Sequence, residues 1–400
     1  MYAFNQFRKL ILFMITIIMA LSVVNGEESV SIKEDSYSYP GLQGVYIRPE
    51  PLNENAIEKY MANIKSWGIQ EVFIEAAYHN RALNHSEIFP VRDIEVDWFE
   101  KLVQAAKEND LKVHAWIKVC YWVHTGEAMK DFSLLVENPD WIDLNRDGNY
   151  ITDEGTYEEQ HFIYVNPAVP GVRQAIYSYI EELMEYDIDG ISIDYIRFKA
   201  CRPDPQYWYG YNPHSVNDFK EKTGMDPREI IPDTSEGSDF MKWVEYNEQI
   251  LSDFVGGISM TIERFNQKMG KEVILSASPF TGYQSGHDSK MQNWQLWDKG
   301  QYIDLWLPMC MSVSMDALKQ EIIDVQEAGL KAPFYPVIYP GQHGVLHPPM
   351  DPHYEVIQET GIDKFVVFSY TQLKEEFENN TDPAPEELDI QVQDCDLLEE

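Results

Sequence analysis

An acidic residue at the end of an apolar run is the clearest candidate for chemistry in this sequence. The stretch DGISIDYIRF, residues 189–198, contains Asp194, and Arg197 follows three residues later. Hydrolysis of a glycosidic bond needs one carboxylic acid that protonates the leaving oxygen and one carboxylate that attacks or activates water. Glu75, near the end of another apolar run, is a candidate for the second carboxyl. We expect Asp194 to act as nucleophile or base, with a structural ion pair to Arg197 as the alternative.

Aromatic and cationic side chains stand near the ends of the same apolar runs. Aromatic rings can cover the apolar faces of a sugar, and arginines pair with carboxylates. Asp288, in an expected loop, is a reserve candidate for the acid, with a solvated surface carboxylate as the alternative. His114 and Trp116 are equally compatible with packing in a core. The side chains that we expect to orient the carboxylates and line a sugar site are Arg48, His114, Trp116, Lys118, Tyr195, Arg197, Trp294 and Tyr370.

One segment has the spacing of a calcium-binding loop. DLNRDGNYITDE, residues 143–154, fits the pattern of alternating acidic or amide residues, a glycine and a closing glutamate. The same letters also suit an ordinary hairpin turn, so both interpretations stay open. No cofactor is required by the proposed chemistry, and Ca²⁺ would be structural. Its ligands would be Asp143, Asn145, Asp147, Asn149 and Glu154.

Eight short β-branched or aromatic runs alternate with amphipathic helical patterns. This alternation predicts a single-domain (β/α)8 TIM barrel, in which active-site groups lie at the carboxyl ends of the strands. A doubly wound sheet is the alternative, but no glycine-rich phosphate turn follows the first run. The predicted strands are residues 44–49, 71–78, 112–119, 189–198, 273–280, 302–310, 334–340 and 364–370.

The two ends of the chain differ in composition from the predicted barrel. Arg8 and Lys9 precede the apolar run 10–24, which ends in small residues, as in a secretory signal peptide; an uncleaved anchor is the alternative. We therefore expect a secreted or periplasmic protein with no stable membrane insertion after cleavage. The expected organisation is a signal peptide at 1–26, a lead-in at 27–43, the barrel at 44–377 and an acidic tail at 378–400.

The charge balance limits the classes of partner. The chain has 31 lysines and arginines against 67 aspartates and glutamates, a formal net charge of -36. Such a surface repels nucleic acid and anionic membranes and suits a neutral or cationic substrate, unless the charge serves solubility alone. The four cysteines form no CxxC pair, which disfavours a zinc or redox motif. A Cys120–Cys201 disulfide and free buried thiols are both compatible with the sequence.

With the strands placed, the chain resembles glycosyl-hydrolase-like family 10. This bacterial group of barrel enzymes includes a glycosidase that acts on peptide-free peptidoglycan strands. The resemblance implies that Asp194 is an active-site carboxylate. Two departures are Asn293, where the family usually has Asp, and Glu75 with Ala77, where Gln and Arg are usual. The motifs that carry it, from about Gly44 to Tyr370, are GVYIRP, ALNHSEIFP, KVHAWIKV, ENPDWI, YVNPAVPGVRQAI, DGISIDYIRF and NWQLWDKGQYIDLWLPM.

These observations give a hypothesis of a secreted glycoside hydrolase that cleaves O-glycosidic bonds of a polysaccharide or peptidoglycan glycan strand. The alternative is a glycan-binding protein that keeps the barrel without catalysis. Metal-dependent hydrolysis is disfavoured, because clustered histidine and carboxylate ligands are scarce at the predicted strand ends.

Overall fold

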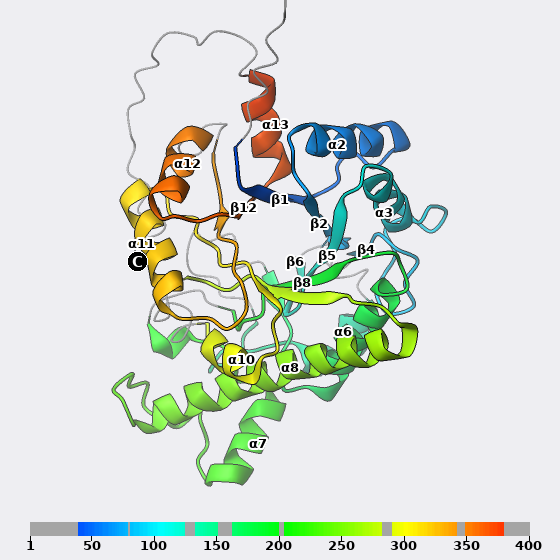
Figure 1. The fold of residues 1–400 in the computed structure, drawn as a ribbon. Coiled ribbons are helices and arrows are strands. Elements are labelled where there is room, and N and C mark those ends of the chain that lie inside the picture. The colour runs from blue at the N-terminus through cyan, green and yellow to red at the C-terminus, as the bar shows by residue number, and fades with distance from the viewer. Residues whose placement is uncertain are drawn as a thin grey trace, which may run out of the picture. The chain divides into compact units, whose positions relative to one another are not determined.

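The computed structural model describes residues 39–78, 81–124, 133–150, 162–199, 204–281, 290–341 and 349–379. These residues form eight parallel strands, each followed by a helix, with the sheet coiled and the helices outside it (Figure 1). The structure thus confirms the predicted (β/α)8 barrel. Its strands are β1 (Leu42–Ile47), β2 (Glu71–Glu75), β5 (Lys112–Lys118), β8 (Gly190–Asp194), β9 (Ile274–Ala277), β10 (Leu305–Trp306), β11 (Val337–Ile338) and β12 (Phe365–Val367).

Hydrogen bonds between the strands close the barrel. The strands are neighbours in the order β10, β9, β8, β5, β2, β1, β12, β11. Between β10 and β11 the amide of Trp306 donates to the carbonyl of Pro333 over 2.9 Å, and the amide of Val337 donates to the carbonyl of Pro308 over 2.8 Å. Because the strands are parallel, their carboxyl ends meet at one rim, where the loops that follow them converge.

Burial on both faces explains why these runs become strands. Every residue of β1 and β2 is buried, as expected for parallel strands covered by helices outside and by side chains inside. The barrel interior is packed by Tyr46, Phe73, Trp116, Leu305, Leu307, Val337 and Val366. Gly190 makes room for one further interior side chain, because a Cβ atom at this position would lie 2.2 Å from Nδ1 of His114.

The helices bury one apolar face each and begin at capping residues. Ser238 accepts a hydrogen bond from the amide of Met241 at the start of α8 (Asp239–Met269), and Asp97 accepts one from the amide of Glu100 at the start of α3 (Trp98–Glu108). Gly270 ends α8 in the left-handed conformation. The barrel helices are α2 (Glu54–Ser66), α3 (Trp98–Glu108), α6 (Pro170–Leu183), α8 (Asp239–Met269), α10 (Trp294–Gly300), α11 (Met315–Glu327), α12 (Met350–Glu359) and α13 (Tyr370–Asn379).

Short elements in the loops decorate the barrel. Two small hairpins follow β2 and β5: β3 (Ala77–Tyr78) pairs with β4 (Arg81–Ala82), and β6 (Tyr121–His124) pairs with β7 (Phe162–Tyr164). Several strands are shorter than the sequence predicted: β8 stops at Asp194, because Tyr195 has a φ of 52° that turns the chain out of the strand. The loop elements are β3 (Ala77–Tyr78), β4 (Arg81–Ala82), β6 (Tyr121–His124), β7 (Phe162–Tyr164), α5 (Ser133–Glu137), α7 (Pro213–Thr223) and the 3₁₀ turns Pro139–Trp141 and Pro205–Tyr207.

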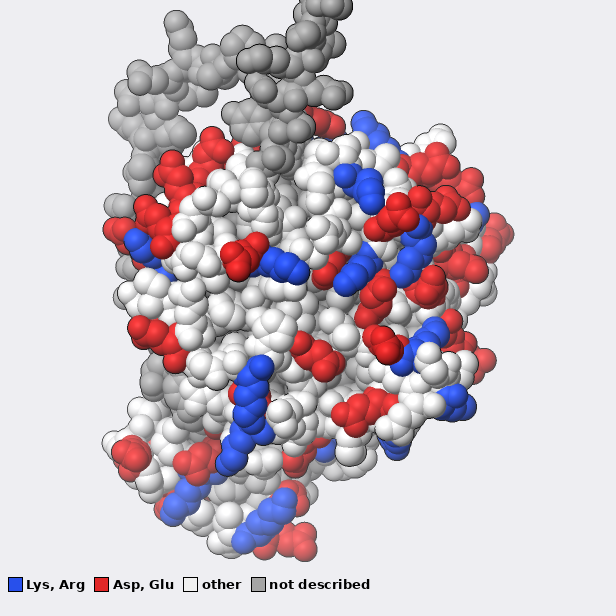
Figure 2. All heavy atoms as spheres, in the orientation of Figure 1, with Lys and Arg blue, Asp and Glu red and all other residues white. Residues whose placement is uncertain are grey.

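The predicted signal peptide, most of the lead-in and most of the acidic tail lie outside the described residues. Within the described part, no helix combines the length and apolar character that a membrane span requires. Cys120 and Cys310 are buried free thiols, and Cys201 lies outside the described part. Figure 2 shows acidic side chains spread over one face of the molecule, with lysines and arginines among them.

Candidate active site

A pocket of about 230 Å³ opens at the carboxyl ends of the barrel strands. Residues in or just after seven of the eight strands line it, so the barrel rim itself forms the walls. The sequence placed several of these side chains correctly at the rim. The lining residues that matter for the chemistry are Arg48 after β1, Trp116 on β5, Asp194 at the end of β8, Tyr195 and Arg197 after it, and Phe368 after β12.

Asp194 is held in the pocket by one hydrogen bond to each carboxylate oxygen. Oδ1 accepts from the amide of Tyr195 over 2.6 Å, and Oδ2 accepts from Nε1 of Trp116 over 3.1 Å. Burial raises the pKa of Asp194, while these two donors and the cations of Lys118 and Arg197 act in the opposite direction. A fixed carboxylate with a raised pKa is suited to accept a proton or to attack an anomeric carbon.

The turn after β8 brings aromatic and cationic groups to Asp194. The left-handed backbone of Tyr195 places its amide on Asp194 and its ring 5.2 Å from that of Tyr121. The buried guanidinium of Arg197 lies 5.2 Å from the ring centre of Tyr195 and 5.5 Å from that of Phe280. A non-glycine residue at positive φ is uncommon, and here it stands at the point where the strand delivers its carboxylate.

Glu75 lies between two cations and does not line the pocket among the described residues. Its Oε1 is 2.7 Å from Nζ of Lys118, and its Oε2 is 3.3 Å from Nε of Arg48. The Glu75 and Lys118 side chains are almost fully buried, at 2% and 3% exposure. This arrangement makes Glu75 a counter-ion that positions Lys118 and Arg48. It does not present a free carboxyl to a substrate in the pocket.

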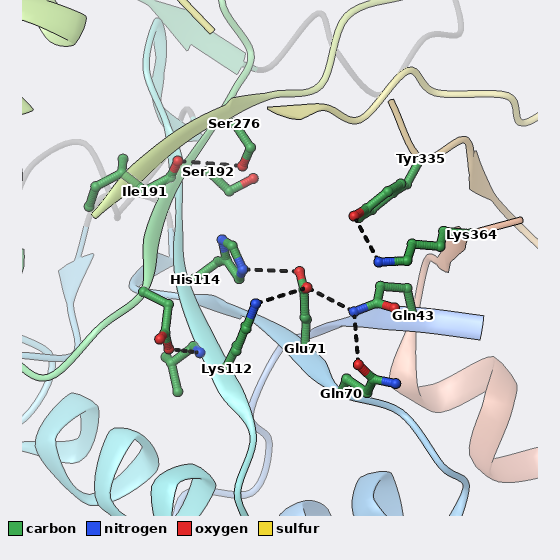
Figure 3. Close-up of polar contacts among 12 residues, drawn as sticks. Gln43, Gln70, Glu71, Lys112, His114, Ile191, Ser192, Ser276, Tyr335 and Lys364 are labelled. Carbon is green, nitrogen blue, oxygen red and sulfur yellow. Dashed lines mark hydrogen bonds and ion pairs between the residues drawn. The ribbon is translucent and has the colours of Figure 1, made fainter. Parts of the chain in front are cut away.

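His114 lies toward the opposite end of the barrel. Its Nε2 is 3.2 Å from Oε2 of Glu71, a carboxylate that also accepts from Nε2 of Gln43 over 2.8 Å (Figure 3). His114 and Lys118 share one face of β5, but four residues at about 3.3 Å each separate them by about 13 Å along the strand. The sequence therefore identified the face correctly and assigned His114 to the wrong end.

Trp294 and Tyr370 are also away from the pocket. Trp294 begins α10 and is buried with its ring 5.9 Å from that of Trp306. Tyr370 begins α13, where its hydroxyl accepts from Nδ2 of Asn63 over 3.0 Å and its ring stacks on Trp67 at 5.4 Å. Tyr370 was predicted as the last residue of the strand 364–370 but begins a helix instead. Both residues therefore pack into the helical layer.

Several pocket residues were not identified from the sequence. Ser278 and Phe280 follow β9 at a two-residue spacing, and Met309 and Met311 do the same after β10. The pattern that could have identified them is the two-residue alternation of inward-facing side chains, which continues beyond the end of each strand. They lack a charged or acidic group, so nothing in the sequence alone marked them as parts of a site.

The first half of the predicted calcium loop forms a hydrogen-bonded turn. Oδ1 of buried Asp143 accepts from Nδ2 of Asn166 over 2.8 Å, and Oδ2 accepts from the amide of Gly210 over 3.2 Å. Oδ1 of Asn145 accepts from the amide of Asn149 over 2.8 Å. These contacts occupy two of the named ligands, while Asp147 is exposed.

Two predicted site residues lie outside the described part of the chain, Glu154 and Asp288. Across the described residues no group of three or more histidine, cysteine, aspartate or glutamate side chains is placed to hold a metal ion. Without Glu154 the calcium interpretation stays a prediction. The role of Asp288 as a reserve acid also stays a prediction.

Asn293 occupies the position where the resemblance leads to an expectation of Asp. Its Nδ2 donates to Oε2 of Glu248, on α8, over 3.0 Å. Glu248 is buried, with 2% exposure. An aspartate at 293 would place two carboxylates against each other, so the amide suits this neighbour.

Comparison with known proteins agrees with this barrel. The model of the glycosyl hydrolase-like 10 family matches residues 52–345. No curated protein matches the chain. A β-galactosidase from the Antarctic haloarchaeon Halorubrum lacusprofundi is similar in structure, with a TM-score of 0.51 and 13% identity over 82% of this chain and 52% of that one.

An α-galactosidase from Thermus thermophilus gives a TM-score of 0.49 and 10% identity over 86% of this chain and 61% of that one. The chain thus spans about half the length of the first of these enzymes and less than two thirds of the second. At such identities the structural likeness to the β-galactosidase shows the barrel fold alone. The family match covers most of the chain, and the chain belongs to the glycosyl hydrolase-like 10 family.

Proposed function

We propose that this protein is an exported glycoside hydrolase that cleaves O-glycosidic bonds of a polysaccharide or glycan strand, with Asp194 as nucleophile or base. One observation carries the proposal: a partly buried carboxylate with a raised pKa stands at a barrel rim in a pocket walled by aromatic rings. Membership in a glycosyl hydrolase-like family supports it. The basic and apolar N-terminal sequence supports export.

In the proposed reaction Asp194 attacks the anomeric carbon or removes a proton from the attacking water. The Tyr195 amide and Trp116 Nε1 hold the two carboxylate oxygens, so the group is positioned before the substrate arrives. The second carboxyl protonates the leaving oxygen. Among the described residues that line the pocket, Asp194 is the one carboxylate, so Asp288, outside the described part, is the candidate acid.

A glycan-binding protein without catalysis is the second candidate. It is favoured by the position of Glu75, whose carboxylate is engaged by Lys118 and Arg48 and is not presented to the pocket. A site with aromatic walls and one carboxylate can bind a sugar without cleaving its bonds. The two candidates share the ligand class and differ in the release of products.

A polysaccharide screen distinguishes them. We expect wild type to release reducing ends from at least one glycan, and Asp194→Asn to bind that glycan with release reduced by at least about a thousandfold, because the variant lacks the reacting carboxylate. Asp316→Asn, an exposed aspartate in the first turn of α11, is the matched control and should retain wild-type activity. Equal release by Asp194→Asn and wild type would refute the assignment. Binding without release by wild type on every glycan would establish the second candidate.

A further inference from the structure

Arg48 directs unused hydrogen-bond donors at the pocket. Its side chain is 44% exposed and lines the pocket, and Nε lies 3.3 Å from Oε2 of Glu75. Within the described part of the chain, the two terminal nitrogens of Arg48 make no hydrogen bond, and Glu75 is the one ion-pair partner of this side chain. Four N–H donors of this guanidinium are therefore available to a ligand.

The guanidinium of Arg48 is held in place from two sides. It lies 5.2 Å from the ring centre of Trp116 and 5.4 Å from that of Phe368, and Glu75 fixes its Nε edge. A planar cation stacked on aromatic rings loses little further freedom when it binds a planar anion. The site is thus organised in advance for a group that accepts two parallel hydrogen bonds.

The positive charge of Arg48 is only partly balanced by the protein. Glu75 carries a single negative charge and is already 2.7 Å from the ammonium of Lys118. The local positive charge of Arg48 contrasts with the composition of the whole chain, in which 67 acidic residues outnumber 31 basic ones. Overall charge acts at long range and is screened within about 8 Å at physiological salt. A ligand in contact with Arg48 therefore experiences the local cation.

Arg48 and Asp194 contact different parts of the Trp116 side chain. Arg48 lies over the ring face, whereas Asp194 accepts a hydrogen bond from the Nε1 edge. A substituent bound by Arg48 and the atom attacked by Asp194 can therefore occupy different positions in the same pocket.

We propose that the pocket binds a sugar unit bearing a carboxylate, and that Arg48 is the residue that recognises this group through paired N–H donors. This inference rests on the proposed function and specifies its substrate class. The carboxylate has two chemical sources, a ring carboxyl as in a uronic acid or an ether-linked carboxyl as in a lactyl-substituted amino sugar. A carboxylate-bearing substrate differs from the neutral or cationic substrate expected from the sequence, because that expectation rested on the total charge of the chain alone.

Calorimetric binding measurements with matched oligosaccharides test this inference. Asp194→Asn serves as the background, so that no substrate is consumed and the charge of the reacting group is the same in every comparison. One pair of ligands is oligogalacturonate and its methyl ester, and the other is peptide-free peptidoglycan oligosaccharide and chitin oligosaccharide. The member of a pair with free carboxylates should bind about tenfold to a hundredfold more tightly, because each charge-assisted pair is worth that much.

Adding Arg48→Gln should abolish the preference for the carboxylate-bearing ligand. Adding Arg48→Lys should retain part of it, because lysine keeps the positive charge but lacks the paired N–H donors of the guanidinium. Arg264→Gln, an exposed arginine on α8, is the matched control and should change nothing. Thermal unfolding verifies that each variant is folded. The pair that shows the preference identifies the source of the carboxylate.

Three results would overturn the inference. Equal or tighter binding of the neutral member in both pairs refutes carboxylate recognition and leaves the proposed function intact if Asp194 still governs release of reducing ends. A preference that survives Arg48→Gln refutes the role of Arg48. Absence of both binding and release with all glycans overturns the proposed function together with this inference.

Discussion

Buried Asp143 should make stability depend on pH in an identifiable way. Burial raises its pKa to about 7, against an ordinary value of 3.8, despite the hydrogen bonds donated by Asn166 and the amide of Gly210. The unfolded chain releases this proton near pH 3.8, whereas the folded protein retains it up to about pH 7. Between these two values folding takes up a proton, so the free energy of unfolding decreases as the pH rises.

The magnitude follows from the two pKa values. They differ by about three pH units, and each unit corresponds to about 1.4 kcal/mol. The contribution of Asp143 to stability therefore decreases by about 4 kcal/mol between pH 4 and pH 7, and it is constant outside this window. Asp143→Asn is neutral at every pH and lacks this change. It also replaces the acceptor for Gly210 or Asn166 by a donor, which costs a pH-independent amount of about 1–3 kcal/mol.

Urea unfolding of wild type and Asp143→Asn between pH 4 and pH 8 checks the prediction. At pH 4 wild type should be more stable than the variant by about 1–3 kcal/mol. By pH 8 this difference should shift by about 4 kcal/mol in favour of the variant. Asp226→Asn is the control: Arg228 holds the pKa of Asp226 below its ordinary 3.8, so its contribution is constant in this window. Parallel stability curves for wild type and Asp143→Asn would show that the buried carboxyl is ionised throughout, and would refute the reasoning.

Three further substitutions test the site and its support. Trp116→Phe removes one donor to Asp194, so kcat/KM should fall about tenfold or more and the acidic limb of its pH profile should move to higher pH; an unmoved limb would contradict the assignment. Glu75→Gln leaves a buried ammonium without its counter-charge, and urea unfolding should show a loss of about 3–5 kcal/mol. Gly190→Ala places a methyl group against His114 and should cost about 1–3 kcal/mol or more in the same assay; an unchanged midpoint would show that the ring moves away freely.

The barrel was predictable because each strand is a short apolar run buried on both faces. Strand positions, their parallel order and the rim position of Asp194 all follow from that pattern and from the rules of the fold. The two-residue period also identified the correct face of β5. The period did not determine the position of each side chain along the barrel axis. Trp116 lines the pocket, whereas His114, two residues earlier on the same face, pairs with Glu71.

The remaining errors in the sequence-based prediction concern the residues at which strands end. β12 ends at Val367 and Tyr370 already belongs to α13, so its ring packs between helices instead of facing the rim. The backbone of Tyr195 turns at positive φ, which no propensity of tyrosine predicts, and this turn delivers its amide to Asp194. Both features depend on where a strand stops, and tertiary contacts determine that point more than local sequence does.

The arrangement of Glu75 explains how a carboxylate at a barrel rim can serve a site without reacting in it. Glu75 lies between Lys118 and Arg48, so its carboxylate allows two cations to stand beside the pocket without a net excess of two charges. Lys118 in turn opposes the rise in the pKa of Asp194 caused by burial, and Arg48 keeps its terminal donors for a ligand. Catalysis and carboxylate recognition would then depend on one buried acid that touches neither the scissile bond nor the bound anion.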